Sequence, residues 1–301
     1  MDCCLNHSLT AYIHNRRQFI QSLGAGLIPG VLPASALAAD GNVLNDQQLL
    51  DSYVRLAGSH DDRLVIWWMD GIRYGVVNAV AKPLYGMKVG MFHRYFLQPD
   101  GSFQIAFFEL TYYTDLQSGR LLKSFDNPYT GETNKVRHVR LGPEVRELTS
   151  QGLMPPKGAA LGDFVKEYRN SLGPAKTGNR KIWIPASVEA TIQFPKPTAP
   201  QILLNLYTTV SGSLADATSN KATTSACDIA FSNVLKWEPW MNMQDRPGQM
   251  MSKAEGMKLF SVTDMPDDYI ACADEVHPSY IADPVSKLQK QVDKIKSKNS
   301  T

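Results

Sequence analysis

One carboxylate, Glu109, is set into the aromatic run FFELTYY at positions 107–113. Alternate residues of a β-strand share a face, so Glu109 would lie on the same face as Phe107 and Tyr113. Both faces of the run are apolar, which predicts a strand buried on both sides, or one that packs against a helix outside a barrel. A carboxylate withdrawn from water in this way either has a raised pKa or is paired with a cation.

Candidate partners for this acid lie one hairpin away. A turn at Pro99-Asp100-Gly101 would bring residues 90–94 opposite residues 106–110. Because a shift of one residue in register exchanges the two faces of a strand, the register decides whether His93 or Arg94 shares the face of Glu109. Arg73 is a second candidate cation.

These residues could form a proton-transfer site. Glu109 would act as acid or base, Arg94 would hold an anion, and Tyr113 would donate a hydrogen bond, with His93 and Tyr74 as alternates. The structural alternative is a Glu–Arg ion pair that fixes the strand register.

Further residues suit an adaptable apolar ligand site. Two tryptophans and five methionines gather in the segment 237–257, although they suit a core layer equally well. In NPYTGE (127–132) the Pro and Gly predict a turn, whose tyrosine would either close a ligand mouth or pack as a corner. The candidate ligand-binding residues are Trp67, Arg73, Tyr112, Tyr129, Trp237, Trp240 and Arg246.

Several kinds of site have no motif here. There is no G-x-S-x-G elbow, no H-E-x-x-H and no C-x-x-C, so the sequence predicts no metal site and no cofactor. Beyond the predicted export segment only Cys227 and Cys272 remain. They would pair in an oxidising compartment or stay as two buried free thiols.

The first part of the chain is typical of an export signal. Arg16 and Arg17 precede a Gly-rich, mildly apolar stretch, and Ala36-Leu37-Ala38 offers small residues to a signal peptidase. The pattern resembles a twin-arginine signal over residues 1–38, which implies the twin-arginine translocase as a partner and a periplasmic or extracellular location. A net charge of +2 gives no electrostatic case for nucleic acid, and no apolar run of about 18 residues predicts a membrane span.

The rest of the chain predicts a mainly β fold. Helical spacing indicates a helix over 43–57 and a short one near 162–171. Strand patterns with tight turns predict an antiparallel meander, with hairpin turns near Asp70-Gly71 and at Pro99-Asp100-Gly101. Closing such a meander into a lipocalin-like β-barrel would remove its edges. We expect one barrel domain over 39–284, a few peripheral helices, and a Lys-rich helical tail over 285–301.

Three stretches carry a resemblance to a known family. They are WWMDGIRYG (67–75), ELTYYTDLQSGRLLKSFDNPYTGE (109–132) and KWEPWMNMQDRPGQMMSKAEGMKL (236–259). The sequence resembles the domain of unknown function 1838 family over roughly residues 42–282. The resemblance implies a β-rich single domain, often exported, and carries no activity to transfer.

The sequence supports three hypotheses. An exported protein would bind a small, partly apolar molecule in a barrel and catalyse cofactor-free acid–base chemistry, as a lyase or isomerase does. A periplasmic lipocalin-like carrier would have the same site without turnover. A structural or interaction protein would have a filled barrel.

Overall fold

The computed structural model describes residues 44–156, 164–193 and 201–298. The predicted export signal, residues 1–38, lies outside the described residues. Residues 42–301 form one compact unit.

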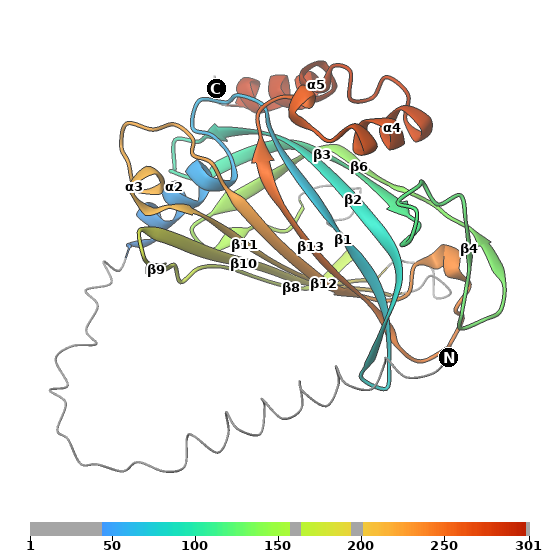
Figure 1. The fold of residues 1–301 in the computed structure, drawn as a ribbon. Coiled ribbons are helices and arrows are strands. Elements are labelled where there is room, and N and C mark those ends of the chain that lie inside the picture. The colour runs from blue at the N-terminus through green and yellow to red at the C-terminus, as the bar shows by residue number, and fades with distance from the viewer. Residues whose placement is uncertain (1–43, 157–163, 194–200, 299–301) are drawn as a thin grey trace, which may run out of the picture. The chain divides into compact units, whose positions relative to one another are not determined.

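The fold is a strongly curved antiparallel sheet, as predicted. Its main path runs β7-β6-β3-β2-β1-β13-β12-β11-β10-β8, with β9 paired to β10, and the path bends into a nearly closed ten-stranded barrel (Figure 1). The strands of the main sheet are β1 (Val65–Val77), β2 (Val80–Leu97), β3 (Phe103–Thr114), β6 (Val139–Thr149), β7 (Gly152–Leu153), β8 (Val165–Leu172), β9 (Lys176–Gly178), β10 (Lys181–Ile192), β11 (Ile202–Ser213), β12 (Asp228–Leu235) and β13 (Gln249–Leu259). A separate hairpin pairs β4 (Ser124–Asp126) with β5 (Thr133–Lys135).

Side chains, rather than a backbone ladder, join the two ends of the path. Among the described strands, β7 and β8 are not paired. Instead the Tyr168 hydroxyl and the Asn170 amide of β8 donate to the Leu153 carbonyl oxygen, at 2.6 and 2.8 Å. We call this junction the seam of the barrel.

Helix α2 (Asp46–Ala57) packs into the interior core at one end of the barrel. Asn45 caps it by accepting from the Gln48 N–H, in a capping box. At its other end, Lys258 of β13 donates from Nζ to the carbonyl oxygens of Arg55 and Gly58 and to Thr224 Oγ1, each at 2.8 Å. The helix is thereby fastened to the barrel wall.

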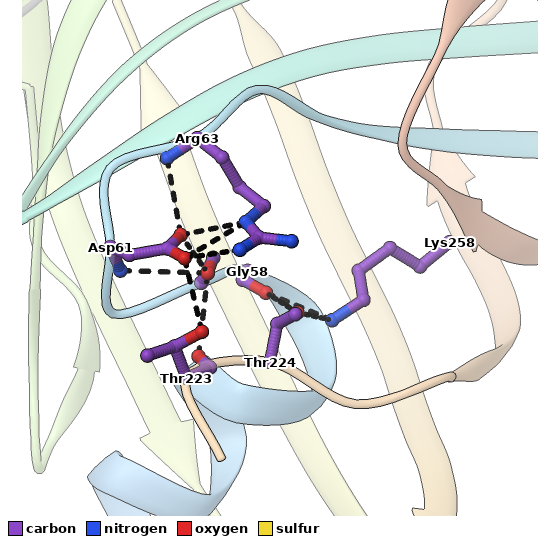
Figure 2. Close-up of polar contacts among 7 residues, drawn as sticks. Gly58, Asp61, Arg63, Thr223, Thr224 and Lys258 are labelled. Atoms are coloured by element: carbon purple, nitrogen blue, oxygen red, sulfur yellow. Dashed lines mark hydrogen bonds and ion pairs between the residues drawn. The ribbon is translucent and has the colours of Figure 1, made fainter.

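Figure 2 shows the surroundings of this contact. Beside Lys258 and Thr224, the Asp61 carboxylate pairs with Arg63 and accepts from the hydroxyls of Ser59 and Thr223. These bonds hold the loop after α2 against the segment that precedes β12, so this end of the barrel is tied together by satisfied polar groups.

Two further helices cover the outer face of β2, β3 and β6 (Figure 1). They are α4 (Asp267–Val276) and α5 (Pro284–Lys298). Leu288, Val292 and Ile295 of α5 are fully or almost fully buried against this face. This explains why β3 is apolar on both sides. The short elements are α3 (Leu214–Ala217), η2 (Pro239–Met241) and η3 (Val262–Asp264).

Two predicted local structures are wrong. Strand β1 runs straight through Asp70-Gly71, and the chain turns at Asn78-Ala79, both with positive φ (50° and 62°). Gly71 serves close packing instead, because a Cβ there would lie 2.2 Å from the Lys253 carbonyl oxygen. The predicted helix near 162–171 is strand β8, paired with β10 from residue 165; positions 162 and 163 lie outside the described residues.

Candidate functional site

Glu109 faces the barrel interior. It is opposite Met91, and His93 is opposite Phe107, so His93 and not Arg94 shares its face. Glu109 is only partly exposed, and Thr111 Oγ1 donates to its Oε1 at 2.7 Å. Desolvation by burial raises the pKa of Glu109, against the opposing effects of Thr111 and of the positive charge of Arg73.

A buried polar network centres on Arg73, which β1 directs into the interior. Its guanidinium donates to Asn233 Oδ1 at 3.4 Å and to the Tyr113 hydroxyl at 3.3 Å, and pairs with Glu238 Oε1 at 3.4 Å. The Tyr113 hydroxyl donates to the same Glu238 oxygen at 2.9 Å. We call Arg73, Tyr113, Asn233 and Glu238 the Arg73 cluster.

Neighbouring strands and one loop segment supply the members of the cluster. Arg73 is opposite Tyr85 on β2 and Ser252 on β13, and Ser252 is opposite Asn233 on β12. Glu238 lies just before η2, whose Trp240 packs against the rings of Tyr85 and Tyr113. The cluster is therefore enclosed between the barrel wall and η2.

The charges of the cluster nearly balance. Desolvation alone would lower the pKa of Arg73, but Tyr113 and Glu238 raise it, so the guanidinium stays charged. Burial raises the pKa of Tyr113 above its usual range, which keeps the phenol neutral. One cation faces one carboxylate, and the site carries almost no net charge.

Polar atoms without a hydrogen-bond partner surround this cluster. Among the described residues, seven buried side-chain atoms lack a partner, and four of them lie here: Arg73 Nε, Tyr85 Oη, Trp240 Nε1 and Ser252 Oγ. Each such atom costs about 1–3 kcal/mol unless something satisfies it. Two of the four, on Arg73 and Trp240, can only donate. The group that completes the site must therefore offer acceptor atoms.

An apolar wall adjoins the cluster along the sheet. Asn233 is opposite Leu206 of β11, and Leu206 is opposite Val188 of β10. Both apolar residues share the face of Val210 and Ile184, which are in the interior core. Leu206 and Val188 nevertheless remain partly exposed, so solvent reaches the inner face of the sheet at this wall.

His93 lies elsewhere in the interior, among the rings of Trp67, Tyr95 and Phe107. Its Nδ1 is buried without a partner. Burial lowers the pKa of His93 to about 3, so the imidazole is neutral at ordinary pH.

The other predicted site residues are spread over three places. One group lies at or near the Arg73 cluster: Arg73, Tyr113, Trp240, Trp237 and Tyr129. Tyr129 packs on Trp237, with the ring centroids 5.1 Å apart. Trp67 lies near α2, where its Nε1 donates to the Ala57 carbonyl oxygen at 2.6 Å. Arg246 is exposed.

Three predicted residues point away from the interior. Arg94 lies on the outer face and pairs with Asp62, with Arg94 Nη2 3.2 Å from Oδ2. The Tyr112 hydroxyl contacts His277 Nδ1 beneath the outer helices, at 3.1 Å. Tyr74 is partly exposed and lies one position beyond Arg73, after the irregularity in the β1–β2 pairing. The structure does not bring these residues to Glu109.

The two cysteines remain unbonded. Cys227 is in the interior core, Cys272 is on the buried side of the outer helix α4, and both are free thiols. No group of three or more potential metal ligands occurs among the described residues, and none of the described helices is long and apolar enough to cross a membrane.

Sequence reasoning missed Glu238, Asn233, Ser252 and Tyr85 as members of the site. The signal for Glu238 was its position in WEPW, an acid between two tryptophans that a purely apolar segment would not carry. Asn233 and Ser252 gave no such signal, because only the register of three strands places them beside Arg73.

The comparison with protein families agrees with the resemblance noted from the sequence. A family model described as protein of unknown function (DUF1838) matches residues 61–173 and 204–297. The chain belongs to this family. Every residue of the Arg73 cluster lies within the matched segments. No curated protein and no solved structure matches the chain.

Proposed function

We propose that this DUF1838 protein binds a small, partly apolar molecule inside its barrel. The observation that carries the proposal is the set of four buried polar atoms without partners around the Arg73 cluster. Their donors would hold an acceptor oxygen of the ligand, and the partly exposed wall of Leu206 and Val188 would contact its apolar part.

The balance of charge refines the ligand class. Glu238 already offsets the charge of Arg73, so a ligand carboxylate would bring a second negative charge into a buried site. A neutral carbonyl or hydroxyl oxygen fits better. The primary function proposed is therefore binding of a neutral, oxygen-bearing apolar compound, as a lipocalin-like carrier does.

The test is mass spectrometry of small molecules that co-purify with the protein. Trp240→Phe removes one donor and keeps an aromatic ring in place. We expect wild type to carry a discrete compound and Trp240→Phe to carry at least several-fold less. Phe231→Leu, an interior change on β12 that removes no polar group, is the control. A wild-type protein that elutes without any bound compound and binds none from a cell extract would contradict the proposal.

Acid–base turnover is the second candidate function, and Glu109 favours it. Its carboxyl group faces the interior, and burial raises its pKa toward the range of a general acid or base. Glu109 would take a proton from a carbon next to a carbonyl held by Arg73 and Trp240, and return it at another carbon. The products of such a reaction are isomers, and no cofactor is consumed.

Deuterium incorporation separates this enzyme from a carrier. The co-purified compound would be incubated with protein in D2O and examined by mass spectrometry. If the protein is an enzyme, the wild type introduces deuterium at a carbon of the compound, and Glu109→Gln abolishes this exchange while the compound still binds. A carrier introduces none with either protein.

We further propose that the protein is exported by the twin-arginine route to the periplasm or beyond. The proposal rests on Arg16 and Arg17 and on the small residues before position 39. Replacing both arginines with lysine should retain the uncleaved precursor inside the cell. Export that is unchanged in this variant, or that persists in cells without the translocase, would contradict it.

A further inference from the structure

A second polar cluster faces the interior beside the seam. Glu144 and Arg146 of β6 form an ion pair and share the face of Leu148, which is in the interior core. The guanidinium of Arg146 lies over the Phe107 ring, 5.6 Å from its centroid. On β8, Tyr168 and Asn170 share the face of Leu172, also in the interior core. We call Glu144, Arg146, Tyr168 and Asn170 the seam cluster.

The four side chains of the seam cluster lie close together. The charge of Arg146 acts on the Tyr168 phenol, although burial raises the pKa of Tyr168 to about 12. Both β6 residues keep partial exposure, 25% for the Glu144 side chain and 14% for that of Arg146. An ion pair that only filled the core would be covered on all sides, so this pair retains a face that another molecule can reach.

The register of the sheet connects the two clusters. One line of opposed residues runs from Arg73 through Ser252 and Asn233 to Leu206, Val188 and Asn170. The line is polar at both ends and apolar in the middle. Three strand spacings separate Asn233 from Asn170, roughly 14 Å along the wall.

We propose that the seam cluster is a second subsite of the ligand site. The ligand class is then a neutral molecule with an oxygen function at each end and an apolar middle. One oxygen is held by Arg73 and Trp240. A hydroxyl at the other end accepts from Arg146 and donates to Glu144. The inference rests on the proposed function and adds the chemistry of the second end.

Two alcohols that differ only at one end test this subsite: 1-dodecanol and 1,12-dodecanediol, titrated calorimetrically into the full-length protein. In a site with no second polar end, the extra hydroxyl weakens binding, because burying it unpaired is costly. With the seam cluster present, the diol binds at least as tightly as the mono-alcohol.

The informative variant is Arg146→Met, which keeps an unbranched side chain over Phe107. We expect about a tenfold loss of diol affinity and less than a twofold change for 1-dodecanol. Arg169→Met, on the outer face of β8, should change neither. Glu144→Gln keeps the shape of the side chain without its charge, and it should also weaken binding of the diol but not of 1-dodecanol. This second variant keeps the test decisive if Arg146→Met does not fold.

Three results would overturn the inference: a diol that binds more weakly than 1-dodecanol to wild type, an equal loss for both alcohols in Arg146→Met, or no binding of either alcohol to wild type. The proposed function is judged separately, by the compounds that co-purify and by their dependence on Trp240.

Discussion

Two buried basic side chains, Arg73 and Lys258, lie on the paired strands β1 and β13, and they differ in how completely their donors are satisfied. Lys258 Nζ donates to three acceptor oxygens, each at 2.8 Å. Arg73 has a salt bridge and two hydrogen bonds but an unpartnered Nε, next to three more unpartnered atoms. A completed set of hydrogen bonds stabilises the fold, whereas an incomplete set beside a partly exposed wall leaves donors that a ligand can satisfy. Neither residue would be distinguished by burial alone.

The largest expected effect is that of Arg73→Met. Removing one partner of a buried pair leaves Glu238 without its cation and should lower the free energy of unfolding by about 3–5 kcal/mol. Ligand binding should be lost as well. Chemical denaturation and analysis of co-purified compounds measure the two effects. Arg73→Lys retains the charge and should recover part of the stability but little of the binding, since a lysine lacks the Nε donor.

Lys258→Met should affect stability alone. It leaves two carbonyl oxygens at the end of α2 without their donor and should cost about 3 kcal/mol. Co-purification should be unchanged at a temperature where the variant is folded. Loss of the bound compound from a folded Lys258→Met protein would contradict the assignment of Lys258 to the fold and of Arg73 to the ligand site.

Trp240→Phe should do the opposite of Lys258→Met, because it should weaken ligand binding and leave stability almost unchanged. The indole N–H has no partner in the barrel, so its removal should change the free energy of unfolding by less than about 1 kcal/mol. Affinity for the bound compound should fall about tenfold, which corresponds to roughly 1.4 kcal/mol. A variant that loses stability but keeps its affinity would assign Trp240 to the core.

Glu109→Gln should change how stability depends on pH. The folded-state pKa lies above the ordinary value of 4.5, so the folded protein binds more protons than the unfolded chain in the window above pH 4.5. Stability should therefore fall as pH rises through that window. Glu109→Gln should remove this fall and raise the free energy of unfolding near neutral pH relative to wild type, because no buried carboxyl group then has to ionise. Urea titrations between pH 4 and 8 measure it, with Glu255→Gln, exposed on β13, as the control.

Ser252→Ala should have the smallest effect on the ligand-free protein. Its hydroxyl is fully buried and without a partner, so the change should alter the free energy of unfolding by less than about 0.5 kcal/mol or raise it slightly. A large destabilisation would mean that the hydroxyl is already satisfied and would remove one of the four atoms from the argument.

The sequence predicted the barrel because its signals are local. Alternation, tight turns and the capped helix over 46–57 each depend on residues close together in the chain, and the opposition of residues 90–94 and 106–110 followed from one turn. The hairpin at Asp70-Gly71 was misplaced because Gly71 accommodates the Lys253 backbone, which is a contact with a strand far along the chain.

The candidate site was only half predictable for the same reason. Arg73, Tyr113 and Trp240 could be selected as polar or aromatic residues in apolar surroundings. Their assembly with Asn233 and Ser252 depends on the order of β1, β13 and β12, which local patterns do not encode. Arg94 was selected as a cation in the segment opposite Glu109, but the register places it on the outer face, one position from His93.

A crystal structure of the protein purified from its natural compartment tests the central claim most directly. The account predicts density for a bound molecule in the barrel, with an acceptor oxygen within hydrogen-bonding distance of Arg73 Nε and Trp240 Nε1. Well-ordered water alone at the four unpartnered atoms, together with an interior closed by side chains, would show that the Arg73 cluster belongs to a filled core and would contradict the proposal.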